Sequence, residues 1–260
     1  MHSQKYLKSC AQKIASKLLK TKKNKKFFNT PFKHLIIDNL IDENFAKKCM
    51  QDFPKTKQKK LWEKSNIKSI EIKYRSIWNS EFDIPENIVS LVRILNSSIF
   101  LKALSKVFSI PKIMPDPYFT GGGLNVTEKG GLLDVHVDGN YHDASGLNRR
   151  LNILLYFNPG WKKSWGGEFG IYSDGGKKCV KKIAPLFNRI VAFDTHDYSF
   201  HGLPNPINFP KNKPRKSLIL YYYTREKRPK KLTKISKPHS ALWLKKNFLD
   251  KKGKVVRRYS

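Results

Sequence analysis

Residues 130–142 have the sequence GGLLDVHVDGNYH, a β-type apolar run that ends in a histidine and an aspartate. In a strand, residues two apart point to the same face, so His136 and Asp138 can bind one metal ion together. Alone, this tripeptide is weak support for a metal site, because HxD occurs by chance and strand-end side chains are often simply exposed or hydrogen-bonded. The rest of the site must lie elsewhere in the chain.

A third ligand is offered by His201, which follows an expected strand at residues 190–194. Two histidines and one carboxylate form the facial triad that leaves three neighbouring positions open on iron(II). His136, Asp138 and His201 are therefore predicted to be metal ligands at a catalytic centre.

Two residues farther downstream suit a dicarboxylic acid. Arg215 and Ser217 fall on one face of the run RKSLILYYYT, residues 215–224. An arginine fork beside a hydroxyl can hold a terminal carboxylate through charge-assisted hydrogen bonds. The alternative is an exposed charge at a strand start. Lys216 is the nearest substitute cation, but alternation points it to the other face.

Short β-rich runs separated by Gly, Pro, Asn and Asp fill the chain from residue 121 onward. They lie at residues 131–137, 151–157, 168–172, 180–183, 190–194 and 218–224. SDGGKK at residues 173–178 predicts a hairpin turn, because Gly175 and Gly176 can adopt positive φ at little cost. Short strands at this spacing predict a sandwich or barrel.

The N-terminal half has helical periodicity instead. A basic amphipathic helix is expected within residues 5–26, either packed on the protein with its lysine face in solvent or bound to an anionic membrane or a partner. A strand at residues 34–40, a helix capped by Asp42 and an exposed lysine-rich loop at residues 55–64 follow. Residues 88–107 are expected to form two helices, or one helix broken near Ser97. The helical stripes should cover one face of the sheet.

The chain has 260 residues, a length that suits one globular domain with additions at both ends. The expected parts are a basic helix at residues 1–30, a strand and supporting helices at 31–115, a jelly-roll core at 116–226 and a basic extension at 227–260. A short apolar patch in the extension, at residues 242–248, is expected to pack on the core.

The formal net charge of +32 is extreme and attracts anionic partners such as nucleic acid, anionic lipid or acidic glycan. Most of the excess is lysine, accompanied by many Asn and Ile. A genome poor in G and C produces such a usage without selection for binding. The charge therefore leaves both explanations open.

Three cysteines, Cys10, Cys49 and Cys179, lie far apart and lack CxxC spacing, which favours reduced thiols in a reducing compartment. No run of about 18 apolar residues occurs, and the N-terminus has no apolar core of the signal-peptide type. We therefore expect a soluble cytoplasmic protein without a transmembrane segment or a disulfide framework.

The order of HxD, a distal histidine and an arginine on the next strand resembles the prolyl 4-hydroxylase-like branch of the iron(II)- and 2-oxoglutarate-dependent dioxygenases. The likeness extends over DPYFTGGGLNV (116–126), GGLLDVHVDGNYH (130–142), RRLNILLYFNPGW (149–161), WGGEFGIY (165–172) and FNRIVAFDTHDYSFHGLPNPI (187–207). The lead-in HLIIDNLIDENF, residues 34–45, is similar as well. The resemblance implies a mainly β fold with flanking helices (α+β), built on a double-stranded β-helix or jelly-roll core.

The resemblance also implies roles for particular residues. Iron(II) would be held by the triad, with 2-oxoglutarate as co-substrate and ascorbate as an accessory reductant. Arg215 would bind the C5 carboxylate of 2-oxoglutarate, and Ser217 and Tyr156 would hydrogen-bond near it. The implied reaction hydroxylates an organic substrate and converts 2-oxoglutarate to succinate and CO2. The segment between His201 and Arg215 departs from many relatives, because it is longer and holds four prolines, Pro204, Pro206, Pro210 and Pro214.

The resemblance leaves the substrate open, because one scaffold serves peptides, small molecules and sugar-linked substrates. Oxidation of nucleic acid is a second enzymatic interpretation, prompted by the charge, but LILYYYT stands where the branch that repairs alkylated bases usually has further arginines. A third interpretation is a basic jelly-roll module that binds nucleic acid or anionic polysaccharide without catalysis. Metal-dependent binding of 2-oxoglutarate separates an enzyme from such a module.

Overall fold

A computed structural model describes residues 2–67, 70–244, 248–249 and 255–256. The α-helices in this part of the chain are α1 (Gln4–Leu19), α2 (Glu43–Gln51), α3 (Glu86–Leu95) and α4 (Ser98–Phe108). The longer strands are β2 (His34–Ile37), β3 (Trp62–Ile67), β4 (Glu71–Ser76), β6 (Gly123–Thr127), β7 (Leu132–Val137), β8 (Asn148–Tyr156), β9 (Phe169–Ser173), β10 (Lys178–Ile183), β11 (Ile190–Asp194), β12 (His201–Leu203) and β13 (Arg215–Thr224). The two-residue strands are β1 (Phe27–Phe28), β5 (Met114–Pro115), β14 (Leu242–Trp243), β15 (Phe248–Leu249) and β16 (Val255–Val256).

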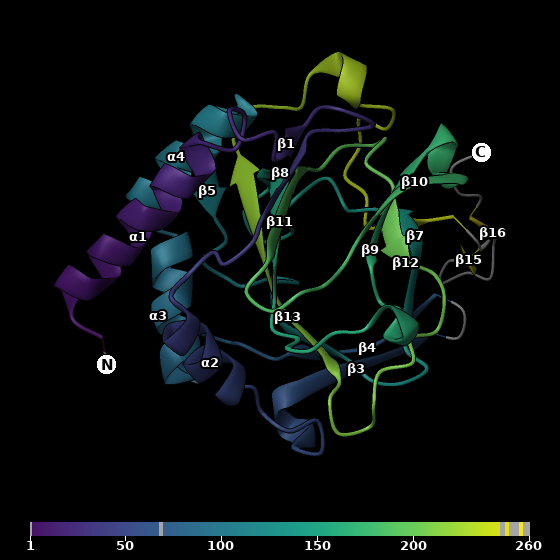
Figure 1. Cartoon of the computed structure of the whole chain (residues 1–260). Coiled ribbons are helices and arrows are strands. Elements are labelled where there is room, and N and C mark those ends of the chain that lie inside the picture. Colours follow the sequence, from purple (N-terminus) through teal and green to yellow (C-terminus); the bar gives the residue numbers. More distant parts are fainter. Residues whose placement is uncertain (1, 68–69, 245–247, 250–254, 257–260) are drawn as a thin grey trace.

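One curled antiparallel sheet forms the body of the molecule (Figure 1). Its strands follow the order β1-β2-β11-β8-β13-β6-β4-β7-β12-β9-β10, with β3 added to β4, β5 to β13 and β14 to β7. The sheet bends so that β8, β11 and β13 lie on one side of the molecule and β7, β9 and β12 on the other (Figure 1). The predicted mainly β fold with a double-stranded β-helix core and flanking helices is confirmed.

The four helices lie together against one half of this sheet (Figure 1). Alternation along β8 explains the arrangement, because Leu151, Ile153 and Leu155 belong to the core cluster that also contains the helices' apolar faces. Burying each such side chain contributes roughly 1.5–3 kcal/mol. The alternate residues Asn152 and Leu154 face the opposite way and line a cavity. One strand therefore serves the core with one face and a site with the other.

Helix α1 packs on the protein rather than standing apart from it. Leu7, Ile14 and Leu18 are buried in the main core cluster, and the helix contacts α3 and α4. Its lysines lie on the outer face, as the packed alternative predicted. Leu19, which was expected on the apolar face of this amphipathic helix, is instead exposed.

Local signals in the sequence placed several elements correctly. The Asp42 carboxylate accepts a hydrogen bond of 3.0 Å from the backbone N–H of Phe45 and caps α2. Ser97 caps α4 and separates it from α3, as the broken helical pattern predicted. Gly175 and Gly176 have φ of 59° and 91° in the turn between β9 and β10.

The expected lysine-rich loop at residues 55–64 was partly wrong. Strand β3 begins at Trp62, whose side chain is buried, and pairs with β4 in a hairpin. The hairpin was missed because charged residues occupy many of its positions, and its pairing depends on cross-strand contacts rather than on an apolar run. Strand β4 joins the sheet between β6 and β7 and so reaches the centre of the molecule.

No single helix among the described residues is long and apolar enough to cross a membrane, and α3 and α4 satisfy that criterion only as a pair bent by 50°. The three cysteines are free thiols, with Cys10 and Cys49 buried and Cys179 exposed.

Candidate metal centre and co-substrate pocket

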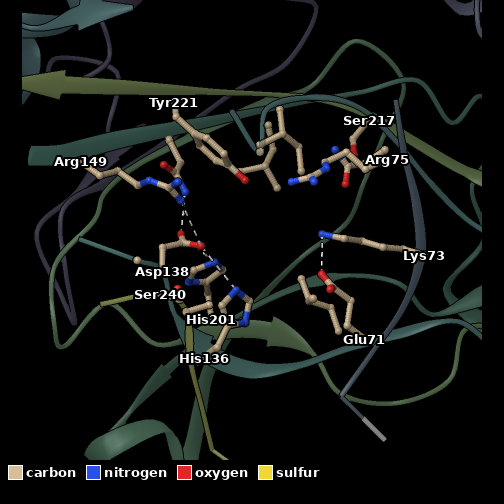
Figure 2. A pocket seen from close by; sticks show the side chains of 18 of the residues that line it. Glu71, Lys73, Arg75, His136, Asp138, Arg149, His201, Ser217, Tyr221 and Ser240 are labelled. Carbon is tan, nitrogen blue, oxygen red and sulfur yellow. Dashed lines mark hydrogen bonds and ion pairs between the residues drawn. The ribbon is translucent and has the colours of Figure 1, made fainter. Parts of the chain in front are cut away.

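A cavity of about 380 Å³ is enclosed by the curled sheet. Its walls come from β4, β6, β7, β8, β12 and β13 and from the segment around β14. Figure 2 shows His136, Asp138 and His201 on one side of this cavity. Arg75 and Tyr221 lie across from them. The cavity therefore joins residues that lie far apart in the sequence.

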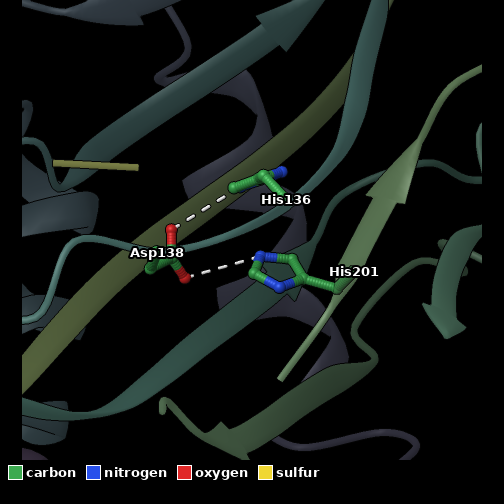
Figure 3. A group of neighbouring side chains, drawn as sticks. All are labelled: His136, Asp138 and His201. Atoms are coloured by element: carbon green, nitrogen blue, oxygen red, sulfur yellow. Dashed lines mark ion pairs between the residues drawn. The ribbon is translucent and has the colours of Figure 1, made fainter. Parts of the chain in front are cut away.

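The predicted triad converges at one point (Figure 3). His136 lies on β7, Asp138 follows that strand, and His201 begins β12, which pairs with β7 so that His201 faces His136. One ligand atom from each side chain lies within 4.8 Å of the others. The carboxylate oxygens of Asp138 are 3.6 Å from Nε2 of His136 and 3.4 Å from Nε2 of His201. All three side chains are buried and could hold a single metal ion.

Hydrogen bonds orient each candidate ligand. Nδ1 of His136 donates to the carbonyl of Asp134 at 2.8 Å, and Nδ1 of His201 donates to the carbonyl of Ser199 at 2.9 Å. Since a carbonyl can only accept, these bonds place the proton on Nδ1 and leave both Nε2 lone pairs directed at Asp138. Such outer contacts fix the ring orientation of metal-binding histidines.

A further contact holds the carboxylate. The side-chain amide of Asn152, on β8, donates to Oδ2 of Asp138 at 2.6 Å. Nη1 of Arg149 lies 3.8 Å from Oδ1 of the same carboxylate. Neither residue was predicted to take part in the site, although both stand in the run RRLNILLY that carries the family resemblance. Alternation with the core residues of β8 could have identified Asn152. It could not have identified Arg149, which reaches the cavity only because the pairing register shifts between Tyr222 and Tyr223.

Electrostatics favour a cation at the triad. Burial, together with the neighbouring His136, lowers the pKa of His201 to about 4. Burial raises the pKa of Asp138, but His201, His136 and Arg149 outweigh that effect and hold it well below its usual range. At neutral pH the site therefore offers a neutral imidazole at His201 and an ionised carboxylate. Nitrogen and carboxylate donors of this kind suit a first-row divalent metal.

A second polar cluster lies on β8 and β13. Arg215 is buried, and its Nε donates to the carbonyl of Gly167 at 2.8 Å. Its guanidinium carbon lies 5.0 Å from the ring centre of Tyr156. Three buried atoms, Nη2 of Arg215, Oγ of Ser217 and the Tyr156 hydroxyl, have no hydrogen-bond partner among the residues that the structure describes. Unpaired buried polar atoms are costly, so this cluster is suited to a ligand carboxylate.

Alternation along β13 separates the predicted co-substrate residues from their neighbours. Arg215, Ser217 and Tyr221 line the cavity, whereas Lys216 points to the other face, where its ammonium lies 5.1 Å from the ring centre of Phe53. Lys216 is therefore no substitute for Arg215.

The C-terminal extension forms one wall of the cavity, which the sequence did not predict. Strand β14 pairs with β7 so that Trp243 lies beside His136. His239, Ser240 and Ala241 line the cavity next to it. The predicted apolar patch does pack on the core through Leu242 and Leu244, whereas the side chain of Phe248 lies outside the described part of the chain.

A buried carboxylate anchors this extension. Asp197 accepts hydrogen bonds from the backbone N–H of Lys234 and Ile235 at 2.7 and 2.9 Å and pairs with Arg228 at 2.9 Å. Asn140 adds a bond of 2.8 Å from the backbone N–H of His239. The extension is therefore held at several points on its way to the triad.

Residues 122–223 match a family model described as the 2OG-Fe(II) oxygenase superfamily. The matched segment contains the triad and Arg215. Iron(II) and 2-oxoglutarate are the cofactor and co-substrate implied by the superfamily together with the His-Asp-His triad. The donor set and the unpaired atoms around Arg215 fit both groups.

Two curated prolyl 3-hydroxylases match this chain over a short stretch. Over 64 residues the chain is 38% identical to prolyl 3-hydroxylase OGFOD1 of Xenopus laevis and 33% identical to prolyl 3-hydroxylase OGFOD1 of Mus musculus. Each match covers 23% of this chain and 12% of the relative. The chain therefore aligns with only a small part of these proteins.

Solved structures of prolyl hydroxylases share the fold. One, from Trichoplax adhaerens, is a prolyl hydroxylase in complex with a hypoxia inducible factor peptide fragment, with a TM-score of 0.60 and 17% identity over 86% of this chain and 94% of that one. Another is a prolyl-4-hydroxylase of Pseudomonas putida, with a TM-score of 0.55 and 13% identity over 82% and 99%. At these identities the likeness establishes the fold alone.

Proposed function

We propose that this chain is an iron(II)- and 2-oxoglutarate-dependent dioxygenase that hydroxylates an organic substrate, with 2-oxoglutarate converted to succinate and CO2. The observation that carries the proposal is the convergence of two histidines and one aspartate in a buried cavity that also contains unpaired polar atoms around Arg215. The two features together match a metal and a dicarboxylate bound side by side.

In this proposal His136, Asp138 and His201 hold the metal. Bound iron supplies the oxidising chemistry by activating dioxygen together with 2-oxoglutarate. The protein keeps the two Nε2 atoms and the carboxylate in a fixed arrangement through Asp134, Ser199 and Asn152. Three protein ligands leave room for the co-substrate and dioxygen.

Arg215, Ser217 and Tyr156 bind the distal carboxylate of 2-oxoglutarate. The Nη2 atom of Arg215 and the two hydroxyls each have an open hydrogen-bonding position there. Arg215 is held in place by its bond to the carbonyl of Gly167, so its free edge is already oriented. A preoriented guanidinium loses little freedom when it binds a carboxylate.

The substrate class follows by analogy. The similar prolyl hydroxylase from Trichoplax adhaerens was solved with a peptide fragment, which supports a peptide substrate with prolyl-type hydroxylation for this chain as well. Small-molecule and glycan-linked substrates are the alternatives, because the fold serves many chemistries. The three free thiols support a reducing compartment, and the cytoplasm is the location we propose.

The test is binding of 2-oxoglutarate to anaerobic protein with and without iron(II), followed by succinate formation when dioxygen and ascorbate are added. Binding should require the metal. The His136→Ala variant should abolish it, and Arg215→Ala should weaken it by about tenfold or more, the loss expected for a charge-assisted hydrogen bond.

A matched control is Lys216→Ala, which removes the neighbouring positive charge from the other face of the same strand. It should bind 2-oxoglutarate like the unaltered protein. A non-catalytic jelly-roll module would show neither metal-dependent binding nor succinate, and that result would refute the proposed function.

A further inference from the structure

Opposite the triad, the cavity wall carries a row of cationic and aromatic side chains. Arg75 comes from β4, Tyr221 from β13 and Arg149 from β8, and Figure 2 shows them along the side facing Asp138. The guanidinium carbon of Arg149 lies 3.9 Å from the ring centre of Tyr221. Strand β4, which carries Arg75, lies outside the segment that matches the superfamily model.

Most cations of the cavity are already engaged. Arg149 lies against Asp138 and donates to the hydroxyl of Tyr223 at 3.4 Å. Lys73 pairs with Glu71 at 2.8 Å, and both of these side chains are about four-fifths buried, with 20% and 19% of their surface exposed. Arg215 belongs to the co-substrate cluster. Each of these three cations therefore already lies beside a carboxylate or belongs to the co-substrate cluster.

Arg75 is held differently. Within the described part of the chain, its acidic partner is Glu63. Glu63 does not line the cavity, and its side chain is 60% exposed. Exposed ion pairs contribute little, because solvent screens them. A guanidinium has five N–H donors, and one carboxylate uses at most two of them. Arg75 therefore retains donors that a second acceptor can use.

The space beside Arg75 is kept open by a glycine. A Cβ added to Gly121 would lie 3.3 Å from Nη1 of Arg75 and 3.2 Å from the ring of Tyr221. A larger residue there would press on both side chains. Gly121 also has a φ of 80°, a conformation that other residues rarely adopt. Arg75 itself lines the cavity, and 34% of its side-chain surface is exposed.

We propose that Arg75 is a binding site for an acidic group, a carboxylate or a phosphate, on the substrate that is oxidised at the triad. This proposal rests on the proposed function and adds to it the chemical class of the substrate. The arginine fork matches the geometry of both groups and binds them through charge-assisted hydrogen bonds. The net charge of +32 raises the local concentration of any such anion around the protein.

The dimensions of the cavity restrict what reaches Arg75. Its 380 Å³ must hold the co-substrate as well, and ligand pockets start at about 300 Å³. The acidic group and the carbon that is oxidised therefore lie close together in the substrate, either within a small molecule or on neighbouring groups of a peptide.

The experiment uses inorganic phosphate and acetate as separate probes of the two acidic groups. Each is titrated by calorimetry against metal-free protein and against protein saturated with manganese(II) and 2-oxoglutarate. In the loaded protein, manganese also enhances the nuclear relaxation of a probe bound close to the triad, which distinguishes the cavity from lysines on the outer surface.

Arg75→Gln should weaken binding of the preferred probe by about tenfold and remove its relaxation enhancement. Glu63→Gln should strengthen binding by about two- to fivefold, because it removes the competing carboxylate. Matched controls change the net charge equally at exposed sites: Lys106→Gln on α4 and Glu43→Gln on α2. Both controls should bind like the unaltered protein.

Equal binding by the unaltered protein and Arg75→Gln, or effects of the controls as large as those of the site variants, would overturn the acidic-group site. Preference between phosphate and acetate decides which acidic group is bound. If 2-oxoglutarate does not bind in the presence of metal, the proposed function is refuted. The titrations of metal-free protein still decide whether Arg75 binds an anion.

Discussion

The indole ring of Trp243 lies 4.5 Å from the imidazole ring of His136, measured between ring centres, with 33° between the two planes. Strand pairing enforces this contact, because β14 adds to the edge of β7 with Trp243 opposite His136. The backbone N–H of Leu244 continues the pairing by donating to the carbonyl of Val135 at 2.8 Å. The C-terminal extension thus supports the face of a candidate metal ligand.

We predict that Trp243→Ala weakens metal binding by roughly tenfold, because His136 loses the ring that fixes its plane. Trp243→Phe should keep most of the affinity. Cobalt(II) titration of each variant gives the dissociation constants. Leu242→Ala is the control: it removes packing from the same strand without touching the imidazole, so it should lower stability alone. Unchanged cobalt affinity in Trp243→Ala would contradict a positioning role.

Asn152 is predicted to hold the Asp138 carboxylate ready for the metal. Removing its 2.6 Å hydrogen bond in Asn152→Ala lets the carboxylate rotate, and we expect metal affinity to fall about 10- to 100-fold. Asn125→Ala tests the specificity of this effect, because Asn125 also lines the cavity but donates to the carbonyl of Gly123. Manganese(II) binding to both variants is the measurement, and equal losses would argue against the assignment.

Gly202, next to His201, is predicted to be essential for the pairing of β12 with β7. A Cβ at this position would lie 2.7 Å from the carbonyl oxygen of Asp134 and 2.9 Å from that of Leu133. Because these are backbone atoms, Gly202→Ala should cost more than about 2 kcal/mol of unfolding free energy and displace His201. Urea unfolding measures this cost.

Gly160→Ala provides the comparison. Gly160 has a φ of 65° but no atom within 4 Å of an added Cβ, so only backbone strain of about 1 kcal/mol is expected. Equal destabilisation by the two alanines would show that the close approach of β12 and β7 is not the cause.

His34 is predicted to make the protein sensitive to acid. Burial lowers its pKa to about 4, with Lys181 adding to the effect, although the hydrogen bond from Nδ1 to the carbonyl of Phe32 opposes it. The folded protein keeps His34 neutral, whereas the unfolded chain takes up a proton near pH 6.5. Its contribution is therefore present above about pH 6.5 and is lost as the pH falls toward 4.

Unfolding free energies of the protein and of His34→Gln at pH 7.5 and 4.5 test this. The unaltered protein should lose on the order of 2 kcal/mol more than the variant between these two pH values. If both lose the same amount, other groups control the acid sensitivity.

Strand periodicity and the family resemblance predicted the candidate metal ligands and the candidate co-substrate residues from the sequence. His136 and Asp138 were recognisable because a strand of period two places them on one face, and Arg215 and Ser217 for the same reason. The cap at Asp42 was equally local, since it depends on a few neighbouring residues. Such features can be predicted because they depend only on residues that are close in the sequence.

Tertiary structure decided what surrounds these residues. Asn152, Arg149 and Arg75 face the cavity because β4 and β8 pair with strands distant in the sequence, and no short-range signal encodes that pairing. Trp243 reaches His136 only because β14 finds the free edge of β7 more than a hundred residues earlier in the chain. Strand pairing is long-range and is specified by the complete sheet. The residues that form the walls of the site could therefore be identified only from the folded structure.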